Sequence, residues 1–221
     1  MIDNFEKYNK LWKLSRNVKP LIILIGGYCG TGKSTFASQI KDRLDFMNII
    51  PTGVIRSIYQ SIYSINEAPY LHGHTYKLFD LEMYSKLSFE KAVIDSYTDQ
   101  VNIVEPGIEK LIEFAHSEGQ QYIIEGNHIM PSLAMKYINK SNVISLFFKT
   151  SNNSTLTLNM TGTTHKRILS EKEILAAIKL QEHTTDEVNK NNLPIFEFDQ
   201  TSKALEFLNN KIGEILLETS M

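Results

Sequence analysis

Short apolar runs alternate with longer segments of helical periodicity along most of the chain. A continuous apolar run bounded by turn residues is typical of a strand that is buried on both faces of a parallel sheet. Runs of this kind lie at 21–25, 46–51, 122–124, 143–148 and 194–198. Strands that alternate with helices favour parallel pairing with right-handed crossovers. We therefore predict an α/β fold, a doubly wound five-stranded parallel sheet in a single domain.

The segments between these runs carry apolar residues every three or four positions, which is typical of amphipathic helices. The predicted helices lie within 1–19, from 33 to 44, within 54–117, from 171 to 189 and after 202. In the long stretch 54–117 we expect breaks at Pro69 and Pro106, because proline lacks the N–H group that a helix interior uses. We expect the helix within 1–19 to pack on the domain.

A glycine-rich loop follows the first predicted strand. Residues 27–34 read Gly-Tyr-Cys-Gly-Thr-Gly-Lys-Ser, which is the Walker A or P-loop pattern. The glycines permit a tight turn in which N–H groups converge on phosphate oxygens, and the following helix N-terminus adds positive charge. We expect Lys33 to reach the β- and γ-phosphates and Ser34 to ligate Mg²⁺. The expected nucleotide contacts are Gly27, Gly30, Thr31, Gly32, Lys33, Ser34 and Thr35.

Two irregular segments, 54–117 and 150–170, emerge beside this loop in the predicted fold. Ligands of open α/β sheets bind beyond the carboxyl ends of the strands. We expect a helical insert at 54–117 to hold a phosphoryl acceptor and the 150–170 segment to close as a lid that excludes water. This organisation predicts a P-loop kinase of the nucleoside monophosphate kinase-like type. The sequence has no Asn-Lys-x-Asp guanine signature, so ATP is favoured.

Composition limits the partners and the compartment. The net charge of −2 and the lack of a basic block argue against a nucleic-acid partner. A single cysteine excludes an intrachain disulfide and suits a reducing compartment. No apolar run approaches the roughly 20 residues that span a bilayer, and the charged first residues do not fit a secretory signal. We expect a cytoplasmic monomer or homodimer with no membrane partner.

Several motifs beyond the P-loop resemble one kinase family. The segments are Gly26–Thr35, Ser-Tyr-Thr-Asp-Gln at 96–100, Val-Glu-Pro-Gly-Ile at 104–108, Glu-Gly at 118–119 and Ile-Ile-Glu-Gly-Asn-His-Ile-Met-Pro at 123–131. Together they resemble the 2-phosphoglycerate kinase family, a branch of the small P-loop kinases. Weaker matches follow at 165–167 and 178–181. The resemblance implies transfer of the γ-phosphoryl group of ATP, with Mg²⁺, to 2-phosphoglycerate, giving 2,3-bisphosphoglycerate.

Polar residues near the predicted strand ends are the candidates for chemistry. Glu125 ends the third strand, where a carboxylate can hold a Mg²⁺-bound water or accept a proton. Arg56 follows the second strand and suits an anionic acceptor because its donors form a fixed fork, and His128 and Lys77 are further acceptor contacts. Arg167 lies where a lid would bring positive charge to the transferring group. The expected catalytic residues are Lys33, Glu125 and Arg167, and the expected metal contacts are Ser34 and Glu125.

Other conspicuous residues have plainer interpretations. His72 and His74 lack a cysteine or carboxylate at ligand spacing, which favours acceptor contacts over a dedicated metal site. Lys166 is expected at a solvated helix start. Lys179 stands where the family pattern has arginine, so it keeps the charge and loses the bidentate geometry. Cys29, inside the P-loop, is expected to be a small side chain without a role.

One position departs from the family pattern. Where that pattern reads Thr-Asp-x-Ile-Arg, residues 52–56 read Thr-Gly-Val-Ile-Arg, so a carboxylate that would orient the acceptor hydroxyl is missing at Gly53. Phosphoryl transfer depends mainly on positioning and charge stabilisation, and Glu125, Glu67 or Asp80 are candidate replacements. Three alternatives stay open: a 2-phosphoglycerate kinase-like enzyme, a kinase for a nucleoside, nucleotide sugar or antibiotic, and a non-catalytic ATP-binding regulator.

Overall fold

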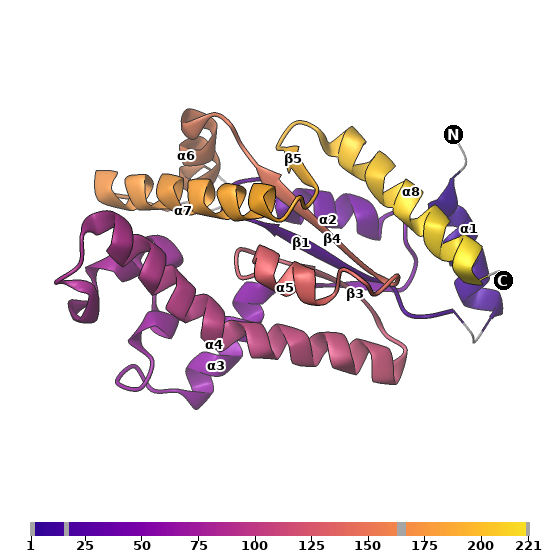
Figure 1. Cartoon of the computed structure of the whole chain (residues 1–221), viewed down its shortest axis with the longest axis horizontal. Coiled ribbons are helices and arrows are strands. Elements are labelled where there is room, and N and C mark those ends of the chain that lie inside the picture. Colours follow the sequence, from indigo (N-terminus) through magenta and orange to yellow (C-terminus); the bar gives the residue numbers. More distant parts are fainter. Residues whose placement is uncertain (1–2, 16–17, 163–166, 220–221) are drawn as a thin grey trace.

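A five-stranded parallel sheet lies at the centre of the protein (Figure 1). The structure is a computed structural model that describes residues 3–15, 18–162 and 167–219. Within these ranges the strands are β1 (Ile22–Gly27), β2 (Met47–Pro51), β3 (Gln121–Glu125), β4 (Val143–Lys149) and β5 (Ile195–Glu197). Their order across the sheet is β2-β3-β1-β4-β5, and all neighbours run parallel. The predicted doubly wound five-stranded sheet is confirmed.

Helices cover both faces of the sheet (Figure 1). They are α1 (Asn4–Leu14), α2 (Lys33–Lys41), α3 (Thr52–Ile62), α4 (Phe89–Glu118), α5 (Pro131–Lys136), α6 (Asn153–Thr161), α7 (Glu171–Lys190) and α8 (Thr201–Thr219), with the 3₁₀ helices η1 (Pro69–His72), η2 (Thr75–Asp80) and η3 (Glu82–Tyr84). Helices α1, α2 and α8 pack on one face, and α3, α4, α5 and α7 pack on the other.

The central strand β1 shows why the apolar runs are continuous. Ile23 and Ile25 enter the hydrophobic cluster beneath α1, α2 and α8, whereas Ile22 and Leu24 enter the cluster on the opposite face. Successive strand residues point to opposite faces, so a strand covered on both sides needs apolar residues at every position. β1 lies between β3 and β4, and the P-loop therefore leaves the sheet at its middle.

Helix α1 packs on its own domain, as the sequence predicts. Phe5 and Tyr8 are buried in the same cluster as α2 and α8. Asn4 donates two hydrogen bonds to Asn209 on α8. Its backbone N–H donates to Asn209 Oδ1 and its Nδ2 donates to the Asn209 carbonyl, each at 2.8 Å. Asp3 caps the helix by accepting from the N–H groups of Phe5 and Glu6.

The predicted break at Pro106 is wrong, because Pro106 lies inside α4, a continuous helix of 30 residues. Figure 1 shows that the helix bends midway along its length, as expected where a proline removes one backbone hydrogen bond. Val104, Ile108 and Ile112 are buried against the sheet and hold both halves in place. The helical stretch is interrupted before Pro69, because α3 ends at Ile62 and Pro69 starts the separate 3₁₀ helix η1.

A third hydrophobic cluster joins the P-loop to the two segments expected to bind ligands. It contains Tyr28 of the loop, Tyr76 of η2, Tyr97 of α4, and Leu156 and Met160 of α6. The segment 150–170 thus includes a helix, α6, which is packed near the P-loop. Residues 163–166, including His165 and Lys166, lie outside the described residues.

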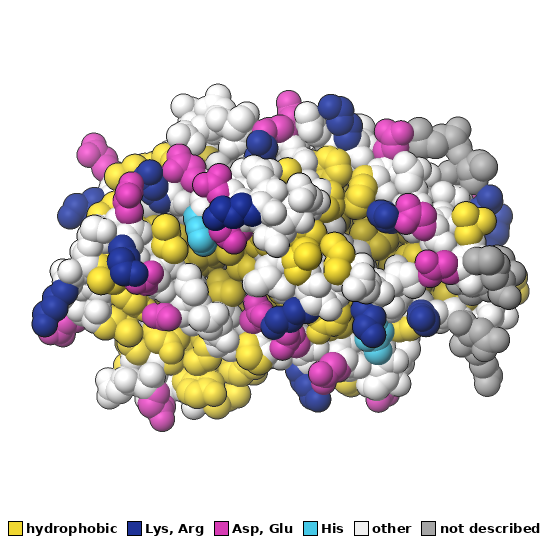
Figure 2. Space-filling model, viewed as in Figure 1, with side chains coloured by type: hydrophobic (Ala, Val, Ile, Leu, Met, Phe, Trp, Pro, Cys, Tyr) yellow, Lys and Arg dark blue, Asp and Glu magenta, His cyan; other side chains and the backbone are white. Residues whose placement is uncertain are grey.

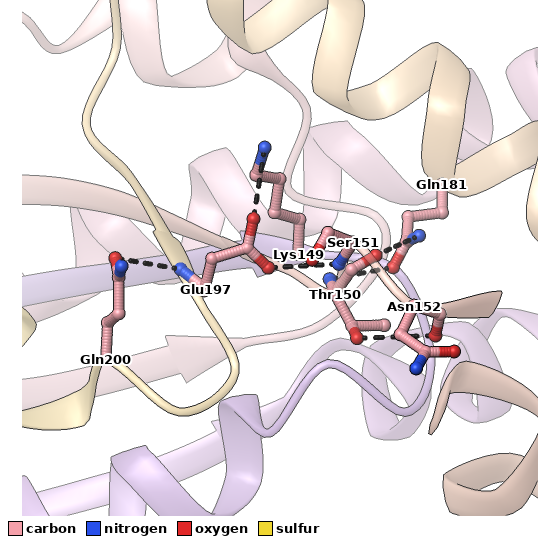
Figure 3. Close-up of polar contacts among 7 residues, drawn as sticks. All are labelled: Lys149, Thr150, Ser151, Asn152, Gln181, Glu197 and Gln200. Carbon is pink, nitrogen blue, oxygen red and sulfur yellow. Dashed lines mark hydrogen bonds and ion pairs between the residues drawn. The ribbon is translucent and has the colours of Figure 1, made fainter. Parts of the chain in front are cut away.

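Polar contacts anchor the start of the 150–170 segment (Figure 3). Gln181 of α7 accepts from the N–H of Thr150 at 3.1 Å and donates to its carbonyl at 2.8 Å. Glu197 of β5 accepts from the N–H of Ser151 at 3.0 Å and pairs with Lys149 at 3.2 Å. The base of this segment is therefore tied to both α7 and β5.

The surface carries charges of both signs and an apolar area over α3, at the lower left of Figure 2. Val54, Ile58 and Ile62, one helical turn apart, are 50%, 57% and 62% exposed, whereas Ile55 faces the core. Both faces of α3 therefore carry apolar residues. None of the helices in the described ranges combines the length and apolar character required to cross a membrane.

Candidate active site

The P-loop backbone adopts conformations that require glycine. Gly27, Gly30 and Gly32 have φ angles of 124°, 81° and 87°. A Cβ atom on Gly27 would lie 2.2 Å from the carbonyl oxygen of Phe148, and one on Gly32 would lie 2.7 Å from the Phe198 ring. The loop therefore has no room for side chains at these glycines, and α2 begins directly after it at Lys33. This is the geometry that presents N–H groups to phosphate oxygens.

The structure brings together the residues expected at the metal and the γ-phosphate. Ser34 Oγ donates to Glu125 Oε1 at 2.9 Å, because β3 pairs with β1 and places Glu125 opposite Ile25. Lys33 is 7% exposed, and its Nζ donates to the carbonyl of Tyr28 at 2.6 Å. Burial holds the pKa of Lys33 below its ordinary value; Glu125 opposes this shift and the Arg167 charge adds to it.

Arg56 and Arg167 place positive charge near the P-loop, and within the described residues neither forms a salt bridge. Arg56 Nη1 donates to the carbonyl of Gly73 at 2.6 Å, and the Arg167 guanidinium lies 5.8 Å from the centre of the Tyr76 ring. Arg56 Nε and Arg167 Nη1 are buried without a hydrogen-bond partner among the described residues. Burial lowers the pKa of Arg56, and the charge of Arg167 lowers it further. Such donors suit an anion.

His128, a predicted acceptor contact, is held by hydrogen bonds within the protein. Its Nδ1 lies 2.8 Å from Thr52 Oγ1 and its Nε2 lies 3.0 Å from Gln100 Oε1. The side chain is 2% exposed. Burial, reinforced by the charges of Arg56 and Lys33, lowers the pKa of His128 to about 3. His128 is therefore a neutral, buried link with both ring nitrogens engaged by the protein.

Of the other basic residues considered in the sequence, His74 lies near the site, whereas Lys77 and Lys179 form salt bridges. Lys77 forms a 2.9 Å salt bridge with Glu173 of α7, so its charge is already paired. The His74 ring stacks on Tyr76 at 5.2 Å, and burial together with the charges of Arg56 and Arg167 lowers its pKa. His74 therefore lies beside the arginine pair. Lys179 pairs on the surface with Glu90 and Glu182.

The candidate replacements for the missing carboxylate are separated by the fold. Glu67 accepts hydrogen bonds from the N–H and Oγ of Ser64 at 2.8 and 2.7 Å, and it is exposed. Asp80 is exposed at the end of η2. Glu125 is the candidate that contacts the P-loop helix. A Cβ atom on Gly53 would meet nothing within 4 Å, so this position has room for a side chain.

Sequence reasoning missed the polar links that tie the P-loop to its surroundings. Tyr28 Oη lies 2.9 Å from Thr75 Oγ1, which also accepts from Asn127 Nδ2 at 3.2 Å. From the opposite side, Asn159 Nδ2 of α6 donates to the carbonyl of Gly30 at 2.7 Å. Tyr28 occupies a P-loop position at which the pattern permits any residue. The pattern therefore carried no signal for this contact.

Acidification is expected to destabilise the protein through His128. Its pKa is about 3 in the folded protein and near 6.5 in the unfolded chain, so between these values the unfolded chain binds more protons and stability falls as pH falls. Between pH 7.5 and pH 5 the loss from this residue is about 2 kcal/mol. Urea unfolding at both pH values measures it. The loss should be smaller in His128→Asn, and an unchanged loss would contradict the assignment.

The sheet order, the P-loop after the central strand and the serine–carboxylate pair define an α/β protein of the P-loop kinase fold. Comparison with known proteins agrees with this class. The chain is 36% identical over 140 residues to the 2-phosphoglycerate kinase of Methanothermobacter thermautotrophicus, a match that covers 62% of this chain and 45% of that protein. It is homologous to the 2-phosphoglycerate kinases, and the resemblance carried by its motifs is confirmed.

Two further relatives define the extent of the match. The 2-phosphoglycerate kinase of Methanocaldococcus jannaschii is 32% identical over 143 residues, which is 64% of this chain and 45% of the relative. That of Methanococcus maripaludis is 27% identical over 224 aligned positions, which is 95% of this chain and 71% of the relative. No protein-family model matches the chain. The chain thus spans about half the length of the first relatives that it matches.

Proposed function

We propose that this protein is an ATP-dependent small-molecule kinase that transfers the γ-phosphoryl group to a hydroxyl of a small anionic acceptor. The names of its relatives make 2-phosphoglycerate the first candidate acceptor, with 2,3-bisphosphoglycerate as the product. The observation that carries the proposal is the pair of arginines, Arg56 and Arg167, whose buried Nε and Nη1 have no hydrogen-bond partner within the part of the chain that the structure describes and lie close to a P-loop.

The loop and its neighbours fit Mg-ATP. The loop has no space for a side chain at Gly27 or Gly32, where a Cβ atom would meet Phe148 or Phe198. A glycine-rich turn of this kind suits the convergence of N–H groups on phosphates. Lys33 would bind the β- and γ-phosphates, and Ser34 with Glu125 would hold Mg²⁺. The metal ion, when bound, neutralises charge on the phosphates. Lys33 is buried at the start of α2 and its Nζ donates to the Tyr28 carbonyl of the loop, so its charge lies at the P-loop and is shielded from water.

The arginine pair would hold the acceptor for in-line attack. A guanidinium binds phosphate or carboxylate through two parallel hydrogen bonds, which fixes orientation as well as position. The acceptor hydroxyl oxygen forms a bond to the γ-phosphorus while the bond to the β,γ-bridging oxygen of ATP breaks, ADP leaves, and the hydroxyl proton is released to solvent. Arg167 would add positive charge to the transferring group. Since this chemistry depends on positioning and charge, it does not require a carboxylate at position 53.

A panel of acceptors with Mg-ATP tests the proposal by the rate of ADP release. We expect 2-phosphoglycerate to stimulate release strongly and uncharged alcohols to have little effect. Stimulation by a nucleoside, nucleotide sugar or aminoglycoside would keep the kinase and replace the acceptor. Tight ATP binding with no stimulation across the panel would contradict catalysis and favour the regulatory alternative.

Arg56→Lys is expected to raise the KM for 2-phosphoglycerate by about ten- to a hundredfold, which corresponds to roughly 1.4–2.8 kcal/mol for a lost charge-assisted hydrogen bond. The lysine keeps the charge and loses the fork. The KM for ATP should not change. Arg43→Lys is the matched control, because Arg43 lies over the Phe5 ring, 5.7 Å from its centre, on the α1 side of the protein. Equal effects of the two substitutions would contradict the role of Arg56.

A further inference from the structure

Four hydrogen bonds and one helical turn form a closed ring that includes Arg56. Thr52 contacts His128, His128 contacts Gln100, Gln100 Nε2 donates to the carbonyl of Gly73 at 3.1 Å, and Arg56 donates to the same carbonyl at 2.6 Å. Thr52 and Arg56 lie four residues apart on α3, so the helix itself closes the ring. The ring joins α3, the loop after β3, α4 and the loop between η1 and η2.

The donor and acceptor roles in the ring are fixed by Gln100. Its amide nitrogen donates to the carbonyls of Tyr70 and Gly73, so its Oε1 is left to accept a hydrogen bond. His128 Nε2 must therefore carry the proton, and Nδ1 accepts from the Thr52 hydroxyl. A histidine with burial-depressed pKa stays neutral and supplies this single tautomer. Thr52 and Gln100 are fully buried and His128 is nearly so.

Gly73 is the point at which the ring meets the site. Its carbonyl accepts from both Gln100 and Arg56, and this double contact holds one arm of the guanidinium. The Nε of Arg56 is buried without a partner among the described residues. A guanidinium is planar, so fixing one arm fixes the directions of its other N–H groups. The orientation of Arg56 therefore depends on where Gln100 holds the Gly73 carbonyl.

We propose that Gln100 is a positioning residue that aims Arg56 at the anionic group of the acceptor, with His128 and Thr52 holding the Gln100 amide in place. This role rests on the proposed kinase function, in which Arg56 binds the acceptor. Within the described residues, the hydrogen bonds of the ring join its members to one another and none of them reaches the P-loop at 27–34. Loss of the ring is therefore expected to affect acceptor affinity far more than ATP affinity.

Gln60 provides a matched control for Gln100. It also donates through Nε2 to a nearby carbonyl, that of Leu71 in η1 at 2.7 Å, but among the described residues it forms no hydrogen bond with Gly73 or His128. Both glutamines can be changed to methionine, which keeps the length of the side chain and removes its hydrogen bonds. If catalysis only requires that residues 71–73 be held in place, the two variants should have similar KM values for the acceptor. If Gln100 specifically orients Arg56, only Gln100→Met should raise that KM.

The first experiment measures steady-state kinetics of the wild type, Gln100→Met and Gln60→Met with Mg-ATP and 2-phosphoglycerate. We expect Gln100→Met to raise the KM for the acceptor at least tenfold, with the KM for ATP within twofold of wild type. Gln60→Met should stay within threefold on both. Thr52→Ser, which keeps the hydroxyl, should stay near wild type, whereas Thr52→Val should shift the acceptor KM in the same direction as Gln100→Met. Equal KM values for Gln100→Met and the wild type would overturn the inference.

A second measurement separates this inference from the kinase proposal. The chain has four arginines, and the Nε–H signal of Arg56 can be assigned in ¹⁵N-arginine-labelled protein from its loss in Arg56→Lys. We expect this signal to move or broaden in Gln100→Met and to stay in place in Gln60→Met. An unchanged Arg56 signal in Gln100→Met overturns the positioning role whether or not the wild type is active. A wild type without acceptor-dependent turnover contradicts the kinase proposal alone.

Discussion

Lys33→Ala is expected to lower acceptor-dependent ADP release by at least about a thousandfold, equivalent to roughly 4 kcal/mol of transition-state stabilisation. Lys33 is the buried cation at the start of α2, and charge develops on the transferring phosphoryl group beside it. The loss should appear in kcat, measured with saturating ATP and 2-phosphoglycerate. Folding should not suffer, because burial of the ammonium group is unfavourable and already lowers its pKa.

Lys41→Ala is the matched control for this substitution. Lys41 is the last residue of the same helix and is exposed. Its removal is expected to leave kcat within twofold of wild type. If Lys33→Ala retained more than a tenth of the wild-type kcat while Lys41→Ala behaved as wild type, the phosphate-binding role of the loop would be contradicted.

Gly126→Ala is expected to destabilise the protein by at least about 3 kcal/mol. A Cβ atom at this position would lie 1.9 Å from Thr52 Oγ1, and the φ angle of 154° is one that L residues rarely adopt. The added methyl group therefore displaces Thr52 and breaks its contact with His128. Urea unfolding at pH 7.5, read as a change in midpoint at constant slope, measures the effect.

Gly53→Ala, in contrast to Gly126→Ala, is expected to stabilise the protein. Gly53 lies in the first turn of α3, and a Cβ atom there meets nothing within 4 Å. Replacing a helical glycine by alanine is expected to stabilise the protein by about 0.5–1 kcal/mol. If Gly126→Ala and Gly53→Ala changed the free energy of unfolding equally, the close approach of Gly126 to Thr52 would not constrain this fold.

The fold follows from local pattern because its strands are covered on both faces. The continuous apolar runs that predict β1, β3 and β4 are a direct result of that double coverage. Pro106 marks the limit of such reasoning. Its local preference is to end a helix, but Val104, Ile108 and Ile112 are buried against the sheet, and their burial outweighs one missing hydrogen bond.

Some contacts of the candidate site follow from local sequence, and others depend on the tertiary fold. The P-loop is contiguous in sequence, and Glu125 meets Ser34 because the parallel strands β1 and β3 are neighbours and end at the same edge of the sheet. The partners of His128 and Lys77 come from helices α3, α4 and α7, and no spacing in the sequence specifies them. Both side chains are engaged within the protein, and their predicted contacts with an acceptor stay predictions.

The most direct test of the account is the product formed from Mg-ATP and 2-phosphoglycerate, followed by ³¹P NMR with Lys33→Ala as the blank. We expect 2,3-bisphosphoglycerate and ADP to appear in equal amounts, with neither accumulating in the blank. Production of ADP with free phosphate alone would show hydrolysis in place of transfer. That result, or no turnover by a protein that still binds ATP, would contradict the proposed kinase.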